Sequence, residues 1–206
     1  DAPVRYYGYG SESLLQARRE RLCKDGTFSF LLVAGEEEIR VRLKVLGEHQ
    51  VENALAAATV GYLLGVSLDD IARGLESYQG YWGRMKSTEL KNGITLVEDV
   101  YNSNPGSMQA ALDFMARFPR KTRIGVFGDM LDLGEESEHW HRVTGKQITS
   151  DFVDILVAVG PLAQGFAEGA ASRSKPPGVI QHFENTPDAL EWLLDKLEPG
   201  SLVLVK

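Results

Sequence analysis

Short apolar runs alternate with amphipathic segments over residues 94–206. The runs have the length and residue types of buried strands and cover 94–97, 124–127, 155–159, 179–183 and 202–205. The segments between them carry apolar residues at helical spacing and predict helices over 105–115, 136–150, 161–171 and 186–197. This alternation predicts an α/β fold with a Rossmann-like, doubly wound and mostly parallel sheet covered on both faces.

The first 80 residues have a different pattern. After a β-rich start, two strands and then two helices are predicted over 27–33, 39–46, 51–63 and 67–75. Residues 78–84 contain two glycines and no periodicity, so the chain is predicted to form two domains, 1–79 and 80–206. Just after this boundary, Asn92-Gly93 lies between two strand candidates and predicts a β-hairpin.

Charge and composition exclude several kinds of partner and location for this protein. The formal net charge of -7 is spread evenly, with nine basic and twelve acidic residues in 1–80 and thirteen and seventeen in 81–206. No basic face is evident, which argues against a nucleic-acid partner. The single cysteine, Cys23, excludes an intrachain disulfide and suits a reducing compartment. The sequence shows neither a membrane-length apolar run nor a signal peptide, so we expect a cytoplasmic protein.

The turn after the strand at 94–97 is the first candidate for chemistry. Glu98 and Asp99 follow this strand, and Asn104-Pro105 is a typical helix start. In open α/β sheets, ligands bind beyond the carboxyl ends of the strands. Three other predicted strands are followed by Gly128-Asp129, Gly160 and Lys206, which are therefore expected at the same edge of the sheet. Together these residues predict a crevice for an anionic ligand, although polar residues also simply end strands.

Other candidates are weaker. Arg84 in a glycine-flanked loop suits phosphate binding, but a solvated arginine explains it equally well. His49 and Asn53 lie at the start of a helix, where they serve either a ligand or the helix end. His139 and His141 point roughly 200° apart on a helix and cannot share a metal, and each alone is more often a surface or capping residue. The phosphate-loop pattern G-x-x-x-x-G-K-[ST] occurs nowhere.

Four motifs resemble those of the Mur ligase family. The first two are Gly47-x-His49-x-x-x-Asn53 and Gly83-Arg84. The third, E-D-V-Y-N-S-N-P at 98–105, resembles the family's D-D-S-Y-N-A-N-P. The fourth, G-D-M-L-D-L-G-E at 128–135 with a later His141, is similar to G-D-M-L-E-L-G-E…H. The last two are typical of the branch that joins D-Ala-D-Ala to UDP-MurNAc-tripeptide.

The resemblance implies a function that composition and residue spacing alone do not indicate. Family members use ATP and Mg²⁺ to phosphorylate a carboxylate, and the acyl phosphate is then attacked by an amine in peptidoglycan precursor synthesis. The expected partners are therefore UDP-MurNAc-tripeptide and D-Ala-D-Ala, and a monomer is expected. By resemblance, the residues that bind ATP are His49, Asn53, Arg84, Asp99, Tyr101 and Asn102, and those on the substrate side of the site are Asp129 and Lys206.

The resemblance also implies what this chain lacks. Residues 1–79 correspond to the tail of a central ATPase domain, and 80–206 to a C-terminal domain that stops before a K-G-S-R loop. The phosphate loop, the metal ligands and the catalytic groups are expected upstream of Asp1, so the isolated chain should be inactive. Gln50, Glu98 and Val100 depart from the family pattern. The second carboxylate of the 98–105 motif, Asp99, is kept, so the resemblance implies the ribose contact there.

Three alternatives remain open. A sister ligase that forms the tripeptide should carry a D-N-P-R signature, which is absent. Folylpolyglutamate synthase shares the architecture but not the G-D-M-L block. A non-catalytic Rossmann-like binding module is the third alternative, and a G-K-[ST] phosphate loop in a longer reading frame would argue against it.

Overall fold

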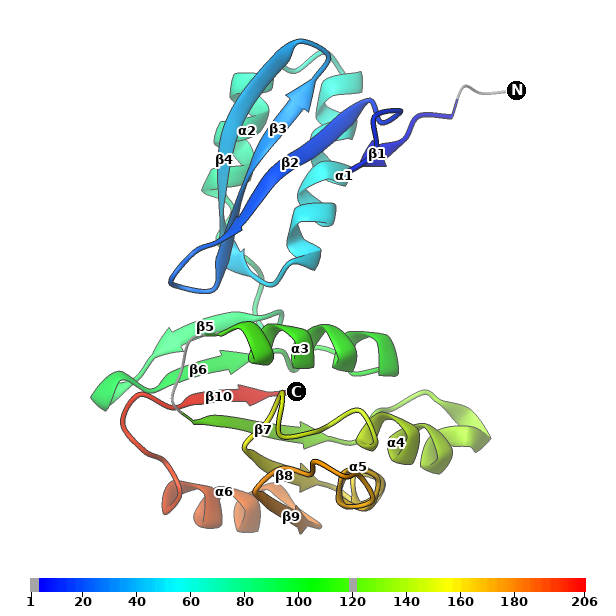
Figure 1. Cartoon of the computed structure of the whole chain (residues 1–206), viewed down its shortest axis with the longest axis vertical. Helices are drawn as coiled ribbons and strands as arrows, with labels where there is room; N and C mark the ends of the chain where they lie inside the picture. Colours follow the sequence, from blue (N-terminus) through cyan, green and yellow to red (C-terminus); the bar gives the residue numbers. More distant parts are fainter. Residues whose placement is uncertain (1–3, 119–121) are drawn as a thin grey trace. The chain divides into compact units, whose positions relative to one another are not determined.

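The structure, a computed structural model, describes residues 4–118 and 122–206. The chain forms two compact units, Asp1–Gly80 and Tyr81–Lys206. Each unit has its own sheet, and in Figure 1 the first is drawn in blue to cyan and the second in green to red. The assignment of residues 1–79 to the tail of a central ATPase domain remains a prediction.

The first unit is a four-stranded sheet with two helices. The strands lie in the order β1-β2-β3-β4, with β2, β3 and β4 antiparallel and β1 parallel to β2. Alternate residues such as Phe30, Leu32 and Val41 are buried with Leu55 in one apolar core. The bounds are β1 Tyr7–Gly8, β2 Leu15–Leu22, β3 Thr27–Ala34, β4 Glu37–Leu46, α1 His49–Leu63 and α2 Leu68–Ser77.

Both helix boundaries in this unit follow from local chemistry. Helix α1 ends at Leu63. Gly65, which follows with φ +82°, turns the chain, and the N–H of Val66 donates to the carbonyl of Gly61 over 3.0 Å. This is the hydrogen bond of a Schellman C-cap. Ser67 then caps α2, because its Oγ accepts from the N–H of Asp70 over 3.2 Å. The predicted end and start are confirmed.

The second unit is a six-stranded sheet in the order β5-β6-β10-β7-β8-β9. Only β5 is antiparallel to its neighbour, and β6, β10, β7, β8 and β9 are parallel. The predicted mostly parallel sheet is therefore confirmed. The bounds are β5 Lys86–Glu89, β6 Thr95–Glu98, α3 Pro105–Arg117, β7 Arg123–Gly128, α4 Ser137–Gly145, β8 Ile155–Val159, α5 Gln164–Ala171, β9 Val179–Phe183, α6 Thr186–Leu194 and β10 Leu202–Val205, with 3₁₀ turns at Lys91–Gly93 and Gly134–Glu136.

The strand order explains how the sheet is covered on both faces. The chain moves from β6 to β7, β8 and β9 in one direction and then returns to place β10 between β6 and β7. Right-handed crossovers put helices α3, α4 and α5 on one face and α6, on the return path, on the other. Ala189 and Leu193 of α6 accordingly pack on Ile124, Val157 and Val203. Figure 1 shows β10 in red in the middle of this sheet.

Helices α4 and α5 approach unusually closely because glycines face each other. A Cβ on Gly145 would lie 2.6 Å from the carbonyl oxygen of Phe166, and one on Gly165 would lie 2.8 Å from Cβ of His141. A Cβ on Gly169 would clash with the carbonyl oxygen of Arg142. Larger residues at these positions would push the two helices apart, so close packing here depends on glycine.

Three predicted helix bounds were wrong. Helix α4 ends at Gly145, because the next N–H groups turn back three residues, as from Ile148 to Gly145 at 3.0 Å. Helix α5 begins at Gln164, since residues 161–163 form a turn. Helix α6 begins at Thr186 as predicted, after a cap in which the Asn185 side chain accepts from Asp188 N–H over 3.1 Å, but it ends at Leu194 and not at 197.

Candidate functional site

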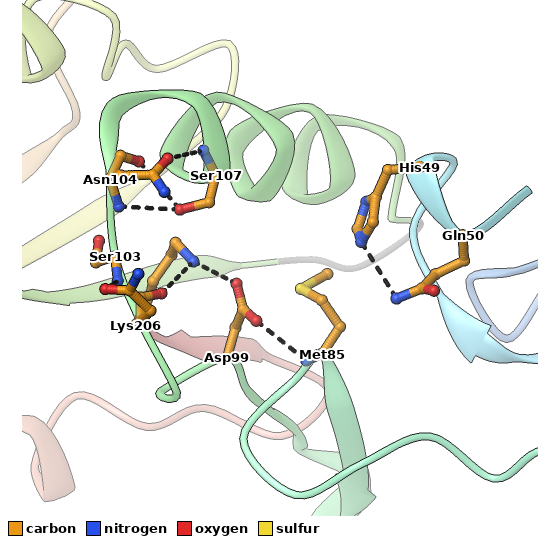
Figure 2. A network of polar contacts seen from close by, with 9 residues as sticks. His49, Gln50, Met85, Asp99, Ser103, Asn104, Ser107 and Lys206 are labelled. Atoms are coloured by element: carbon orange, nitrogen blue, oxygen red, sulfur yellow. Dashed lines mark hydrogen bonds and ion pairs between the residues drawn. The ribbon is translucent and has the colours of Figure 1, made fainter. Parts of the chain in front are cut away.

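The turn between β6 and α3 is built as predicted. Asn104 caps α3 by accepting from the N–H of Ser107 over 2.9 Å, and Ser107 Oγ accepts from the N–H of Asn104 over 3.0 Å. Pro105 follows at the first helical position, where its missing N–H costs nothing. This reciprocal cap, visible in Figure 2, sets the start of the helix and therefore the course of the turn that carries Asp99.

Asp99 and Lys206 form an ion pair at the carboxyl ends of β6 and β10. Lys206 Nζ lies 2.5 Å from Asp99 Oδ2 and donates to the carbonyl oxygen of Asn102 over 3.2 Å. The side chains are 1% and 16% exposed, respectively. The other carboxylate oxygen, Oδ1, accepts from the N–H of Met85 over 3.2 Å. Asp99 is thus held from two sides, as Figure 2 shows, and keeps a partly exposed carboxylate.

The Arg84 side chain stacks on Tyr101, which follows Asp99 by two residues. The guanidinium carbon of Arg84 lies 4.1 Å from the centroid of the Tyr101 ring, a favourable cation–π distance. The N–H of Tyr101 donates to the carbonyl of Gly83 over 3.0 Å. Gly83 has φ +69°, and a Cβ there would meet Tyr101 N at 3.3 Å. The glycine therefore allows the segment that carries Arg84 to approach Tyr101 closely.

Asp129 lies at the end of β7 and makes different contacts. Its Oδ1 accepts from the N–H of Ala163 over 2.7 Å, just before α5. A Cβ on Gly160 would lie 2.6 Å from that carboxylate, and Gly160 has φ +114°. Asp129 thus ties the end of β7 to the turn after β8. The side chain of Lys206 contacts Asp99, and its assignment to the substrate side with Asp129 stays a prediction.

His141 is fully buried, contrary to the expectation of a surface or capping residue. Its Nε2 accepts from the N–H of Met130 over 2.8 Å, so Nδ1 carries the proton and donates to the carbonyl of Ser137 over 2.6 Å. The ring also packs on Phe166, with centroids 4.9 Å apart. His141 therefore holds the loop after β7, and the histidine that follows the G-D-M-L motif in the resembling family signature was the signal for it.

His49, Gln50 and Asn53 meet at the start of α1, in the first unit. Gln50 Nε2 lies 3.3 Å from His49 Nε2, and Gln50 Oε1 accepts from Asn53 Nδ2 over 3.1 Å. Gly47 has φ +97°, a backbone conformation that L side chains rarely adopt, which favours glycine at this turn. Gln50, a departure from the family pattern, thus links the two residues predicted to contact adenine.

The described residues do not fit a metal site. Within 4–118 and 122–206 they contain no group of three or more His, Cys, Asp or Glu side chains that could hold an ion. They fit part of a nucleotide better, because a partly exposed carboxylate and an exposed guanidinium match a ribose diol and a phosphate. None of the described helices is long and apolar enough to cross a membrane.

The fold defines a Rossmann-like domain, and this polar edge is its candidate ligand site, at the carboxyl ends of the parallel strands. Comparison with known proteins identifies it further. The family model for the Mur ligase glutamate ligase domain matches residues 83–206. The chain belongs to the Mur ligase family.

Relatives share most of this chain but are longer. UDP-N-acetylmuramoyl-tripeptide–D-alanyl-D-alanine ligase of Bacillus subtilis is 29% identical over 204 residues, which are 98% of this chain and 44% of the relative. The enzyme of the same name from Escherichia coli is 36% identical over 154 residues, covering 75% of this chain and 32% of the relative.

Solved structures agree with the fold. MurF from Acinetobacter baumannii superposes with a TM-score of 0.84 at 31% identity, over 97% of this chain and 42% of that one. MurF from Thermotoga maritima, solved in complex with ADP, superposes with a TM-score of 0.79 at 23% identity, over 98% of this chain and 44% of that one. The chain thus spans about two fifths of the length of these proteins.

Proposed function

We propose that this chain is part of an ATP-dependent ligase that joins D-Ala-D-Ala to UDP-MurNAc-tripeptide in peptidoglycan precursor synthesis. One observation carries the proposal: relatives that bear this enzyme's name match 75–98% of the chain at 29–36% identity. The turn at 98–105 and the loop at 128–135, whose motifs resemble this branch, lie at the carboxyl edge of one sheet. An enzyme working as a cytoplasmic monomer is part of the proposal.

The residues of this chain would bind and orient ATP. Asp99 would accept hydrogen bonds from the ribose hydroxyls, and Arg84 would meet the phosphates. Tyr101, stacked on Arg84, would hold the guanidinium in place, and the Asn102 carbonyl holds Lys206. His49 and Asn53 would contact the adenine, while Asp129 would shape the amino-acid end of the site. When bound, ATP supplies the phosphoryl group that activates the carboxylate of the peptide substrate.

Mg²⁺ and the catalytic groups belong to the rest of the proposed enzyme. The described residues do not form a metal site. We propose that the phosphate loop and metal ligands lie in the part of the relatives that this chain does not cover. The contribution of this chain is then positioning, which supplies a large share of the barrier reduction in transfer between two bound substrates.

ADP release tests the proposal. A full-length protein that contains this chain should release ADP only when ATP, UDP-MurNAc-tripeptide and D-Ala-D-Ala are all present. The isolated 206-residue chain should release none. Replacement of D-Ala-D-Ala by D-glutamate or by a diamino acid provides the control, because sister ligases use single amino acids. ADP release with one of these, and none with the dipeptide, would reassign the chain to another branch.

A further inference from the structure

We propose that Lys206 is a positioning residue of the nucleotide site, which orients the Asp99 carboxylate toward the ribose. The sequence motifs place Lys206 on the substrate side, but its ammonium contacts Asp99 and the Asn102 carbonyl. The inference rests on the proposed function for its ligand, ATP, and adds a residue and a role to that site.

The Lys206 ammonium is buried, so it can interact only with the groups packed directly against it. The Lys206 side chain is 1% exposed, so it is shielded from solvent and from any ligand of ordinary size. Its backbone is fixed as well, since its N–H donates to Val126 over 2.9 Å and its carbonyl accepts from Gly128 over 2.7 Å. A charge in such surroundings requires a partner, and Asp99 Oδ2 at 2.5 Å is that partner.

Two donors, one on each oxygen, fix the plane of the Asp99 carboxylate. Lys206 Nζ holds Oδ2, and the N–H of Met85 holds Oδ1 over 3.2 Å. Each carboxylate oxygen accepts up to two hydrogen bonds, so one acceptor position on each remains. Two adjacent acceptors match the two hydroxyls of a ribose. With the plane fixed in advance, the diol meets an oriented acceptor and less rotational freedom is lost on binding.

This arrangement predicts a selective effect on the ribose contact. If Lys206 acts through Asp99, its removal should weaken binding of ATP and leave binding of 2′,3′-dideoxy-ATP unchanged. If Lys206 only supports the fold, both nucleotides should be weakened in proportion. The ratio of the two dissociation constants therefore separates positioning from general structural support.

The experiment uses a full-length protein containing this chain and measures the Kd of both nucleotides by calorimetry. For the wild type we expect dideoxy-ATP to bind about tenfold more weakly, the size of one to two hydrogen bonds. Lys206→Met should reduce the ratio to about twofold, and Lys206→Arg, which keeps the charge, should restore most of it. Lys175→Met, at an exposed pair with Asp151 (3.5 Å), is the matched control and should keep the wild-type ratio.

An unchanged ratio in Lys206→Met, in protein with a cooperative thermal transition, would overturn the inference. A ratio near one in the wild type would also overturn it, because the ribose would then make no contact worth orienting. Both results concern nucleotide binding alone. The proposed function is tested separately by ADP release, so loss of ligase specificity with an intact ratio would refute the function and leave the role of Lys206 in place.

Discussion

The imidazole of His141 links Met130 to the start of α4 and is the partner of the buried Met130 N–H. It accepts from Met130 N–H over 2.8 Å and donates to the Ser137 carbonyl over 2.6 Å. Because Met130 is fully buried, water cannot replace the histidine. The loop that carries Asp129 is therefore held to the start of α4 by a single side chain.

Removal of His141 should destabilise the second unit and loosen this loop. His141→Ala leaves a cavity and removes the partner of the buried Met130 N–H, and should lower the free energy of unfolding by about 3 kcal/mol. His141→Phe fills the space but removes both hydrogen bonds and should cost about 2 kcal/mol. Denaturant unfolding measures both, and hydrogen exchange at Met130 N–H should speed up in both.

The neighbouring histidine provides the control. His139 is exposed on the same helix, so His139→Ala should change stability by less than about 0.5 kcal/mol. If His141→Phe unfolds at the wild-type denaturant concentration, the two hydrogen bonds are not what holds the loop.

The close contact of α4 and α5 predicts a strong glycine effect. Gly169→Ala would force a Cβ against the Arg142 carbonyl and should destabilise the chain by about 1–3 kcal/mol. Gly74→Ala is the matched control, because Gly74 lies within α2 with open space around it. That change should stabilise the chain by about 0.5–1 kcal/mol. Thermal unfolding that shows equal shifts for the two variants would contradict the packing argument.

The pair of Arg123 and Asp154 predicts an acid-sensitive contribution to stability. Burial by itself raises the pKa of Asp154, but hydrogen bonds from the Arg123 side chain (2.9 Å) and N–H (2.8 Å), together with its charge, hold that pKa below the usual value. The contribution is therefore complete above the unfolded carboxyl pKa of about 3.9 and is lost as the pH falls below it.

Asp154→Asn tests this dependence. At neutral pH the variant should lose about 1 kcal/mol, a figure that allows for solvent screening of the 37% exposed Asp154 side chain. Melting temperatures of the wild type and variant should converge as the pH falls toward about 3. Asp151→Asn, at an exposed pair, should have little effect at neutral pH. A gap between wild type and Asp154→Asn that stays constant in acid would refute the assigned role.

Asp99→Ala should weaken ATP binding and should also lower the stability of the fold, each for its own reason. In a full-length protein the KM for ATP should rise about fivefold or more, since a ribose hydrogen bond is lost. Stability should also fall by about 3 kcal/mol, because the Lys206 ammonium is left buried without its carboxylate. The double variant Asp99→Ala/Lys206→Met should regain stability but not affinity.

A carboxylate elsewhere in the second unit controls for general effects of charge removal. Asp113, exposed on α3, should tolerate Asp113→Ala with no change in the KM for ATP. An unchanged KM in Asp99→Ala would remove the ribose assignment, whatever its effect on stability.

Much of the local structure could be predicted because adjacent residues determine it. Asn104 and Pro105 start α3 by capping, and Asn92 and Gly93, with φ of 64° and 72°, turn the β5–β6 hairpin. Strand β2 was not recognised individually, because its second half is charged and mostly exposed. Its place in the sheet depends on pairing with β3, which local pattern does not reveal.

The sequence by itself determined the types of the elements, the class of the second unit and the motifs that resemble the Mur ligases. Each of these depends on residue spacing or on contacts within one turn. Only the tertiary structure decided that β10 lies between β6 and β7, and with it that Lys206 meets Asp99 across 107 positions of sequence. Such a contact is set by strand order and by the requirement that a buried charge be paired, and neither is visible in a local pattern.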